Sequence, residues 1–213
     1  FVHPNQILVL LYYYLLKYKN WHGPCVRNIA TTHLLDRVAE AFGETCYEVP
    51  VGFKHISAAM QEHNAVSGGE SSGGLTVRGH INGKDGIYAA TLLVEMLSVT
   101  GKTMSQLMKG IYAEFGTAYM SEFDWPFDQE MKDQLHHLLM VEKQLPSFPI
   151  PVVATNYMDG CKVLFENGWI IARFSGTEPR LRVFCEMPTR EEAERLTAVM
   201  AEFLGLPMPV KMV

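Results

Sequence analysis

The first 50 residues alternate between helical and strand patterns, and this alternation limits the folds open to the chain more than any other feature. An apolar run at residues 7–16 predicts a helix that is buried on most faces, and residues 26–30 predict a short strand. A threonine then caps a second helix, 31–42, and residues 45–49 predict a second strand. Strands that alternate with helices are typical of a sheet with crossover helices. We therefore expect an α/β domain with a mixed sheet.

The later part of the chain has a different pattern. Residues 127–141 predict a helix, and Asn167-Gly168 is a strong two-residue turn signal between two apolar runs. A capping box that starts at Thr189 opens a closing helix. Between the two parts the pattern loosens. We therefore expect an α/β domain at 1–118, a hinge at 119–126 and a small α+β domain at 127–213.

Composition argues against several classes of function. The chain has 213 residues, a net charge of −5, and 48% hydrophobic and 19% charged residues, as in an ordinary globular protein. This acidic balance gives no indication of a nucleic acid or an anionic membrane as partner. The longest apolar run, 7–16, is shorter than the ~20 residues of a membrane-spanning helix. Four widely spaced cysteines without a C-x-x-C pair favour reduced thiols in a cytoplasmic protein.

The segment Arg173–Pro179, Arg-Phe-Ser-Gly-Thr-Glu-Pro, contains the groups that bind a phosphate. A guanidinium can pair with a phosphate through two hydrogen bonds, and the hydroxyls of Ser175 and Thr177 can each donate one more. Gly176 allows backbone N–H groups to approach an anion closely. Apolar runs on both sides predict a strand–loop–strand unit. The alternative is an ordinary hairpin whose turn happens to be Ser-Gly-Thr.

A second segment, Ser67–Gly74, is rich in glycine and serine but contains one carboxylate, Glu70. Such a composition usually indicates a flexible linker, which is one interpretation. A linker has no need of a carboxylate, however. A carboxylate with a hydroxyl nearby, here that of Ser72, suits the hydroxyl groups of a sugar ring. The segment alone leaves both interpretations open.

Two lysines are candidates for binding an anion. Lys54 follows Gly52 after a predicted strand, and Lys84 comes directly before Asp85, the predicted N-cap of a helix. A lysine at that position is well placed beside an anion that also uses the helix dipole. Each lysine can equally be a solvated surface charge. The eight histidines show no metal-ligand spacing.

Together these segments resemble the α-D-phosphohexomutase family, which comprises the phosphoglucomutases and phosphomannomutases. They occur in the family's order and at its spacing across nearly the whole chain. The resemblance implies that the chain corresponds to the family's third and fourth domains, the fourth with a fold like that of the TATA-box-binding protein. The matching segments are Arg27–Arg37, Val49–Lys54, Gly69–Gly74, Lys84–Ile87 and Arg173–Pro179.

The resemblance implies substrate-binding roles for residues in both domains. In the third domain it implies two sugar-hydroxyl readers, a lysine that faces the active centre and a loop that approaches the substrate. In the fourth domain it implies a phosphate-binding loop. The matched residues, in that order, are Glu70 and Ser72, Lys84, Gly52 and Lys54, and then Arg173, Ser175, Gly176 and Thr177.

The resemblance also implies what the chain lacks. The family's first domain carries a phosphoserine in a Ser-His-Asn-Pro type segment, and its second carries an Asp-Gly-Asp-x-Asp-Arg loop that binds Mg²⁺. Neither string occurs here, and the chain begins at Phe1 rather than at a methionine, so we expect a piece of a longer protein. We expect no catalytic residue in this chain, apart from Lys84 as a possible active-centre lysine, and no metal ligand.

In the family, the phosphoserine donates its phosphoryl group to a hexose 1- or 6-phosphate. The hexose 1,6-bisphosphate intermediate then reorients and returns its other phosphate. The resemblance thus implies the substrate-recognition half of a glucose or mannose phosphate mutase, with a phosphosugar and the missing N-terminal domains as partners. The alternatives are a phosphoglucosamine or phosphopentose mutase, and a non-catalytic phosphosugar-binding module.

Overall fold

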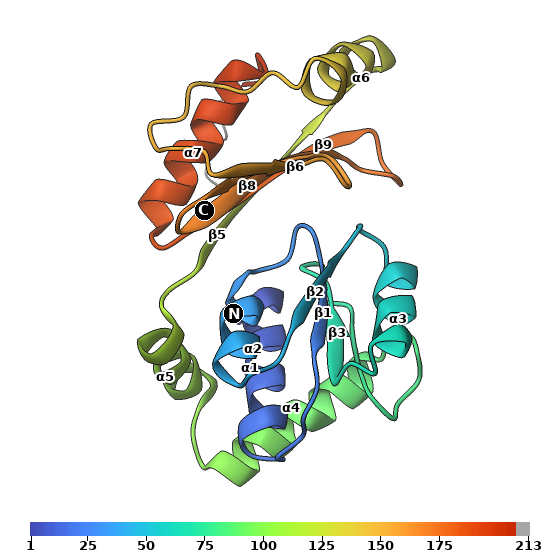
Figure 1. Ribbon diagram of the computed structural model, residues 1–213, viewed down its shortest axis with the longest axis vertical. Coiled ribbons are helices and arrows are strands. Elements are labelled where there is room, and N and C mark those ends of the chain that lie inside the picture. The colour runs from blue at the N-terminus through green and yellow to red at the C-terminus, as the bar shows by residue number, and fades with distance from the viewer. Residues whose placement is uncertain (208–213) are drawn as a thin grey trace. The chain divides into compact units, whose positions relative to one another are not determined.

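The computed structural model describes residues 1–207 and contains two compact units (Figure 1). Unit 1 comprises Phe1–Thr117 and unit 2 comprises Ala118–Val213. Each unit has its own sheet, so each is described by itself. No helix in the described part of the chain has the length and apolar character needed to cross a membrane.

Unit 1 contains a four-stranded mixed sheet, as expected. Its order is β2-β1-β3-β4, in which β1 pairs in parallel with β2 and with β3, while β4 runs antiparallel to β3. The carboxyl ends of the three parallel strands therefore meet at one edge of the sheet. The strands are β1 (Cys25–Asn28), β2 (Cys46–Val49), β3 (Ser67–Gly69) and β4 (Leu75–Val77).

Helices cover both faces of this sheet, so unit 1 has three layers (Figure 1). Helix α3 packs on one face, and helices α1 and α2 lie on the other. The apolar run of the first helix is buried almost throughout, as its sequence predicts. The five helices are α1 (Pro4–Lys17), α2 (Leu34–Ala41), α3 (Phe53–Glu62), α4 (Gly86–Thr100) and α5 (Met104–Phe115).

Strand β3 is formed by the glycine-rich segment, because helices pack directly against its backbone. A Cβ atom on Gly68 would lie 2.5 Å from Sδ of Met60 in α3. A Cβ atom on Gly69 would collide with Leu8 of α1. The two glycines thus face opposite layers, as alternate residues of a strand do. The flexible-linker interpretation of this segment is therefore wrong.

Unit 2 contains a five-stranded antiparallel sheet with the order β5-β9-β8-β7-β6. Residues 119–126, which we expected to act as a hinge, form strand β5 and pair with β9 along their whole length. The expected hairpin joins β7 to β8, but Gly168 already pairs with Phe165, so its loop is Glu166-Asn167 rather than Asn167-Gly168. The strands are β5 (Tyr119–Pro126), β6 (Ala154–Asn156), β7 (Cys161–Phe165), β8 (Gly168–Phe174) and β9 (Arg180–Met187).

The helices of unit 2 lie on one face of its sheet (Figure 1). Helix α7 (Arg190–Phe203) packs against β5 and β9, and α6 (Gln129–His136) continues into a short π-helix, η1 (His137–Val141). Leu139 of η1 and Leu196 of α7 belong to the same apolar core beneath the sheet. The α+β class is therefore confirmed, while the likeness to the TATA-box-binding protein stays a prediction.

Candidate functional site

Glu70 lies in a tight turn that joins β3 to β4 at the carboxyl end of β3. Its backbone N–H donates to the carbonyl of Gly74 (2.9 Å), and the N–H of Gly73 donates to the carbonyl of Glu70 (2.9 Å). Gly73 has a φ of +99°, which is accessible mainly to glycine. Only 5% of Glu70 is exposed. The turn is therefore closed by its own hydrogen bonds and presents a carboxylate in one defined position.

The carboxylate of Glu70 brings together three of the residues that the sequence analysis selected. Its Oε1 accepts a hydrogen bond from Oγ of Ser72 (3.0 Å) and forms an ion pair with Nζ of Lys84 (2.5 Å). Its Oε2 lies 3.5 Å from Nδ2 of Asn28. A buried carboxylate needs such partners, because burial without them is costly. The side chain of Lys84 itself remains half-exposed.

Lys84 reaches Glu70 along the surface of the turn. Its aliphatic chain crosses Gly74, where a Cβ atom would lie 2.5 Å from Cε of Lys84. Its ammonium lies 5.3 Å from the centroid of the Phe53 ring, at the start of α3. Gly74 and Phe53 thus flank the side chain of Lys84 and form a channel around it. This side chain is half-exposed, so its ammonium can bind a ligand.

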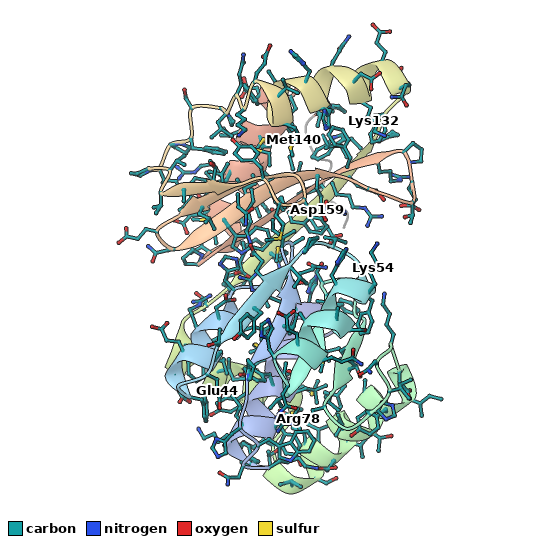
Figure 2. The ribbon with its side chains drawn as sticks, turned by 45° about the vertical axis from the view of Figure 1, so that its right-hand side comes forward. Glu44, Lys54, Arg78, Lys132, Met140 and Asp159 are labelled. Carbon is teal, nitrogen blue, oxygen red and sulfur yellow. The ribbon has the colours of Figure 1, made fainter. Side chains whose placement is uncertain are left out.

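The predicted pair Gly52 and Lys54 lies at the amino end of α3, beside that channel. Gly52 is the N-cap residue with a φ of +128°, a conformation that residues with a Cβ rarely adopt. Lys54 is exposed in the first turn of the helix (Figure 2). Phe53, between them in sequence, links this turn to Lys84. Unit 1 therefore places its five predicted residues around one turn and one helix start.

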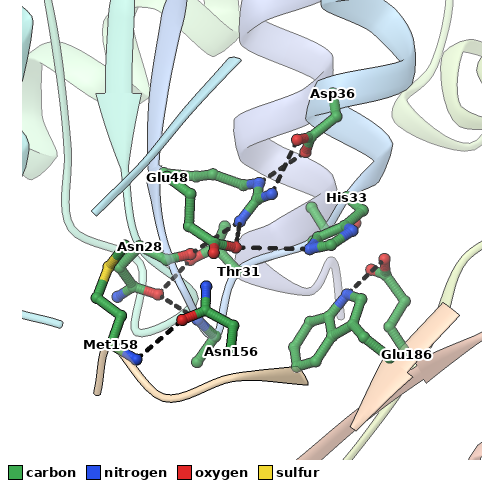
Figure 3. Close-up of polar contacts among 12 residues, drawn as sticks. Asn28, Thr31, His33, Asp36, Glu48, Asn156, Met158 and Glu186 are labelled. Atoms are coloured by element: carbon green, nitrogen blue, oxygen red, sulfur yellow. Dashed lines mark hydrogen bonds and ion pairs between the residues drawn. The ribbon is translucent and has the colours of Figure 1, made fainter. Parts of the chain in front are cut away.

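Asn28 and Thr31 belong to this cluster but were not among the predicted site residues (Figure 3). Oδ1 of Asn28 accepts from Oγ1 of Thr31 (2.8 Å) and from the backbone N–H of Ala30 (3.0 Å). Oγ1 of Thr31 in turn accepts from the backbone N–H of Ser71 (3.0 Å). These bonds fasten the Glu70 turn to the end of β1. A buried polar residue that ends an apolar strand is the sequence signal that we overlooked.

Arg27 anchors the same end of β1 through a buried ion network (Figure 3). It binds Asp36 of α2 through two nitrogens (2.6 and 2.8 Å) and Glu48 of β2 through a third (2.5 Å). Burial alone would lower the pKa of Arg27, but the hydrogen bonds and charges of these carboxylates outweigh it and raise the pKa. Arg27 is therefore a permanent cation with a structural role.

The Ser175–Thr177 loop of unit 2 is an open hairpin tip between β8 and β9. The N–H of Ser175 donates to the carbonyl of Arg180 (2.8 Å), which closes the base of the hairpin. At the tip, the two hydroxyls are 3.5 Å apart, and the N–H of Thr177 lies 3.4 Å from Oγ of Ser175. Apart from Gly176 and its two chain neighbours, no atom of residues 1–207 lies within 4 Å of a Cβ placed on Gly176. Hydroxyls and N–H groups thus surround open space.

Arg173, at the end of β8, is the least satisfied cation of this hairpin. One terminal nitrogen lies 3.4 Å from Oδ2 of Asp159, at the long end of the hydrogen-bond range. Its Nε is buried and has no hydrogen-bond partner in the described part of the chain. Directly opposite Arg173 in the ladder, Arg182 binds Glu178 at 2.7 Å. Opposing residues of a ladder share one face of the sheet, so both arginines lie on the same face next to the loop.

The site residues do not form a metal centre. Among residues 1–207 no three histidine, cysteine, aspartate or glutamate side chains are grouped closely enough to hold an ion. The Mg²⁺ loop that the resemblance implies belongs to another domain of the family, so we derive no step through a metal from these residues. All four cysteines are free, and burial raises the pKa of the Cys161 thiol to about 11, which suits inert core thiols.

Unit 1 is thus an α/β/α domain with a carboxylate–lysine turn, and unit 2 is an antiparallel-sheet domain with an arginine loop. Two family models match these units. The model for phosphoglucomutase/phosphomannomutase, alpha/beta/alpha domain III, covers residues 3–115, and that for the C-terminal domain covers residues 140–203. The chain belongs to the phosphoglucomutase/phosphomannomutase family.

Individual relatives agree with this assignment. A phosphoglucomutase/phosphomannomutase of Thermococcus kodakarensis is 30% identical over 177 residues, which cover 82% of this chain and 36% of that protein. The crystal structure of a putative phosphomannomutase from Thermus thermophilus has a TM-score of 0.71 at 28% identity, over 94% of this chain and 39% of that one. Other relatives are named phosphomannomutase and phosphoglucosamine mutase.

A more distant neighbour shares the fold alone. The N-acetylphosphoglucosamine mutase of Aspergillus fumigatus, solved with GlcNAc-6P and magnesium, has a TM-score of 0.57 at 15% identity, over 96% of this chain and 47% of that one. The chain spans about two fifths of the length of the curated relatives that it matches.

Proposed function

We propose that this chain is the substrate-recognition part of a phosphohexomutase that interconverts hexose 1-phosphates and hexose 6-phosphates of glucose or mannose. Unit 2 binds a phosphate group through the Ser175–Thr177 loop, and unit 1 binds sugar hydroxyls through the Glu70 turn. The observation that carries the proposal is the buried, unpaired Nε of Arg173 next to an open loop of donors. A buried donor without a partner is costly, and an anion at that position would remove the cost.

The phosphate assignment rests on the number and type of groups in unit 2. Arg173 offers a planar fork of donors, and Ser175 and Thr177 each add a hydroxyl. A dianionic phosphate has enough acceptor oxygens for all of them. Arg182, opposite Arg173, extends the proposed site, because its present partner Glu178 is an exposed carboxylate that an anion can replace. These groups form charge-assisted hydrogen bonds, which are the stronger kind.

The sugar assignment rests on the fixed geometry of unit 1. Glu70 accepts hydrogen bonds, while Ser72 and Lys84 can donate, so the three together match a pair of neighbouring sugar hydroxyls. Because the turn is closed by its own backbone bonds, a ligand has little ordering entropy to overcome. Gly52 and Lys54 add a flexible cation at the amino end of α3, which suits a second anionic group.

The chemical step of the reaction requires groups from outside this chain. We propose that its phosphoserine and its Mg²⁺ ligands lie outside this chain, and that a hexose 1,6-bisphosphate is the intermediate. Phosphoryl transfer of this kind depends on positioning and charge neutralisation, and recognition residues supply the positioning. The isolated chain should therefore bind phosphosugars and should not turn them over.

Titration of the chain with glucose 6-phosphate, followed by NMR, tests the proposal. We expect shifts in both the Glu70 turn and the Ser175–Thr177 loop, with inorganic phosphate shifting the second alone. Arg173→Ala should weaken binding about tenfold or more, since a charged hydrogen bond is worth ~1.5–3 kcal/mol. The control is Arg195→Ala, an exposed arginine of α7. Unchanged affinity in Arg173→Ala would contradict the phosphate site.

Two alternatives have distinct outcomes in related assays. A phosphoglucosamine mutase, a name carried by some relatives, should prefer glucosamine 6-phosphate in the same titration. A non-catalytic phosphosugar-binding module should bind with full affinity and show no mutase activity in the intact polypeptide either. Conversion of glucose 1-phosphate to glucose 6-phosphate by the isolated 213-residue chain would overturn the division of labour that we propose.

A further inference from the structure

A short segment, 78–85, joins β4 to α4 and carries Lys84 into the site. It starts with a turn in which the N–H of His80 donates to the carbonyl of Val77 (3.2 Å), and Gly79 supplies the positive φ (+84°) that the turn requires. Oγ1 of Thr76 donates to the carbonyl of Ile81 at 2.6 Å. These two bonds hold the first part of the segment, up to Ile81, against strand β4.

His80 is fixed on two sides by residues at the start of α4. Its ring stacks on the ring of Tyr88, with centroids 3.9 Å apart and planes inclined by 12°. Its Nε2 lies 2.9 Å from Oδ2 of Asp85. An ionised carboxylate only accepts hydrogen bonds, so Nε2 carries the proton and donates it. The hydrogen bond between His80 and Asp85 therefore closes residues 80–85 of the segment into a loop.

The two oxygens of Asp85 have separate tasks. Oδ1 accepts from the backbone N–H groups of Ile87 and Tyr88, both at 3.0 Å, as the N-cap of α4. Oδ2 accepts from His80. The hydrogen bonds from the Tyr88 amide and from His80 lower the pKa of Asp85, so this carboxylate is ionised at neutral pH. An ionised aspartate next to Lys84 in sequence is a rival to Glu70 for its ammonium.

We propose that His80 is a positioning residue for the sugar-binding site: by occupying Oδ2 of Asp85, it leaves Glu70 as the carboxylate that Lys84 binds. This inference rests on the proposed function, in which Lys84 contributes to sugar binding by pairing with Glu70. In the observed arrangement Oδ2 of Asp85 pairs with His80, while Oε1 of Glu70 pairs with Lys84. Without the imidazole, Oδ2 of Asp85 loses this donor and can compete with Glu70 for the ammonium of Lys84.

A variant at His80 is interpretable because other bonds hold the segment in place. The carbonyl of Asn82 accepts from Oγ of Ser57 in α3 (3.0 Å), and that of Ile81 accepts from Thr76. The cap of α4 by Oδ1 of Asp85 also persists. We therefore expect His80→Ala to remain folded, with Lys84 redistributed between the two carboxylates.

The test is an NMR titration of the chain with glucose 6-phosphate in three variants. His80→Ala and His80→Phe, which keeps the ring stack but has no donor, should both bind about two- to fivefold more weakly, as expected for competition between exposed ion pairs. In His80→Ala/Asp85→Asn, affinity should return to within about twofold of the unaltered chain, because asparagine caps a helix as well as aspartate but carries no charge. Thermal unfolding of each variant checks that it is folded.

The outcomes are distinct. Recovery in the double variant supports the inference, because a loss caused by packing alone would persist or deepen when Asp85 is changed as well. Equal affinity of His80→Ala and the unaltered chain, or no recovery in the double variant, overturns the inference and leaves the proposed function in place. No binding of glucose 6-phosphate by the unaltered chain overturns the proposed function, and the inference with it.

Discussion

The two loops at the centre of the proposal are built in opposite ways. The Glu70 turn is closed by backbone bonds, and its carboxylate has partners in Ser72, Lys84 and Asn28. The Ser175–Thr177 loop has long, weak contacts at its tip and a neighbouring Arg173 with an unpaired buried nitrogen. The first loop is complete without a ligand, whereas the second has donors that lack acceptors.

This difference separates two contributions of a polar group. A buried carboxylate with partners contributes to the stability of the folded state, and removing it leaves those partners unsatisfied. A cation without a partner in the free protein contributes little to the stability of the folded state and much to the affinity for an anionic ligand. Substitutions in the two loops should therefore have their main effects on different measurements, and the following predictions test that separation.

The largest effect is expected for Arg27→Ala, which removes the buried cation at the end of β1. Breaking a buried ion pair from one side costs about 3–5 kcal/mol. Because the side chains of Asp36 and Glu48 are 36% and 20% exposed, we expect the low end, a fall of about 3 kcal/mol in the free energy of unfolding of unit 1. Urea unfolding with hydrogen-exchange readout of peptides from each unit measures it.

Arg195→Ala, an exposed position on α7, is the matched control and should stay within about 0.5 kcal/mol. A fall of less than about 1 kcal/mol in Arg27→Ala would mean that the network does not hold the site end of β1.

A direct comparison of the loops places a glutamine at one charged position in each loop region. Glu70→Gln keeps the shape of the side chain but removes the charge opposite Lys84, and should lower the free energy of unfolding of unit 1 by about 1–2 kcal/mol. Arg173→Gln removes a buried nitrogen without a partner but also a long contact to Asp159, so the two effects oppose each other and the stability of unit 2 should change by less than about 1 kcal/mol. Urea unfolding of both variants measures these values.

Binding should reverse the order of the two variants. Inorganic phosphate, titrated by NMR, should bind Arg173→Gln about tenfold more weakly and Glu70→Gln with nearly unchanged affinity. Equal losses of stability in both variants would remove the distinction between the loops.

Two glycines offer a finer test, since neither needs a positive φ. A Cβ atom at position 74 would contact the chain of Lys84, whose flexible end can move, so Gly74→Ala should lower the stability of unit 1 by about 1 kcal/mol. Gly176 has open space around it, so Gly176→Ala should be neutral within about 0.5 kcal/mol and should weaken phosphate binding by obstructing close approach. Thermal unfolding and phosphate titration give the two readouts, and a stability loss in Gly176→Ala would contradict the open loop.

The smallest effect concerns alkaline pH in unit 1. Burial and a hydrogen bond to Glu95 (2.6 Å) raise the pKa of Tyr14 to about 12, above the ordinary value of about 10. The contribution of Tyr14 is therefore complete below pH 10 and is lost as the pH rises towards 12. We expect a fall of about 1 kcal/mol or less over this window, because the pair is partly screened by solvent.

Tyr14→Phe should flatten this part of the pH profile of unfolding. Tyr119→Phe in β5, where the tyrosine is 37% exposed, is the control and should leave the profile unchanged. An unchanged profile in Tyr14→Phe would show that other groups cause the alkaline loss.

Local patterns predicted most of the framework. The capping box at Thr103, the N-cap Asp85 and the stop at Gly101 set the ends of α4 and α5 where the sequence indicates them. The hairpin between β7 and β8 lies within one residue of the Asn167-Gly168 signal, with Glu166 and Asn167 as its loop residues. These features depend on neighbours in sequence, which is why they can be read without a structure.

Features that depend on distant packing were missed. Strand β3 is a Ser-Gly-Gly segment, and only the helices that press on Gly68 and Gly69 explain why glycine is needed there. Helix α3 begins after Gly52 without a side-chain cap, so no local start signal marks it in the sequence. Strand β5 was taken for a hinge because its pairing partner, β9, lies far along the chain.

The site residues show the same difference between local signals, which could be predicted, and distant contacts, which could not. Glu70, Ser72 and Lys84 were selected from the sequence, and the structure brings them into contact. Asn28 and Thr31 were not selected, because their role depends on the end of β1 lying beside a turn some forty residues later. Residues that act by supporting others leave no local motif.

The pairing of β5 with β9 also sets an order of events during synthesis. Unit 1 can complete its sheet and helices as soon as Thr117 has left the ribosome. Strand β5 emerges next, but its neighbour in the sheet is the last strand to be made. Until β9 appears, β5 remains an unpaired edge, which is the kind of surface that other chains and chaperones bind. The nascent chain therefore carries one finished domain and one exposed strand for most of the time that unit 2 is being translated.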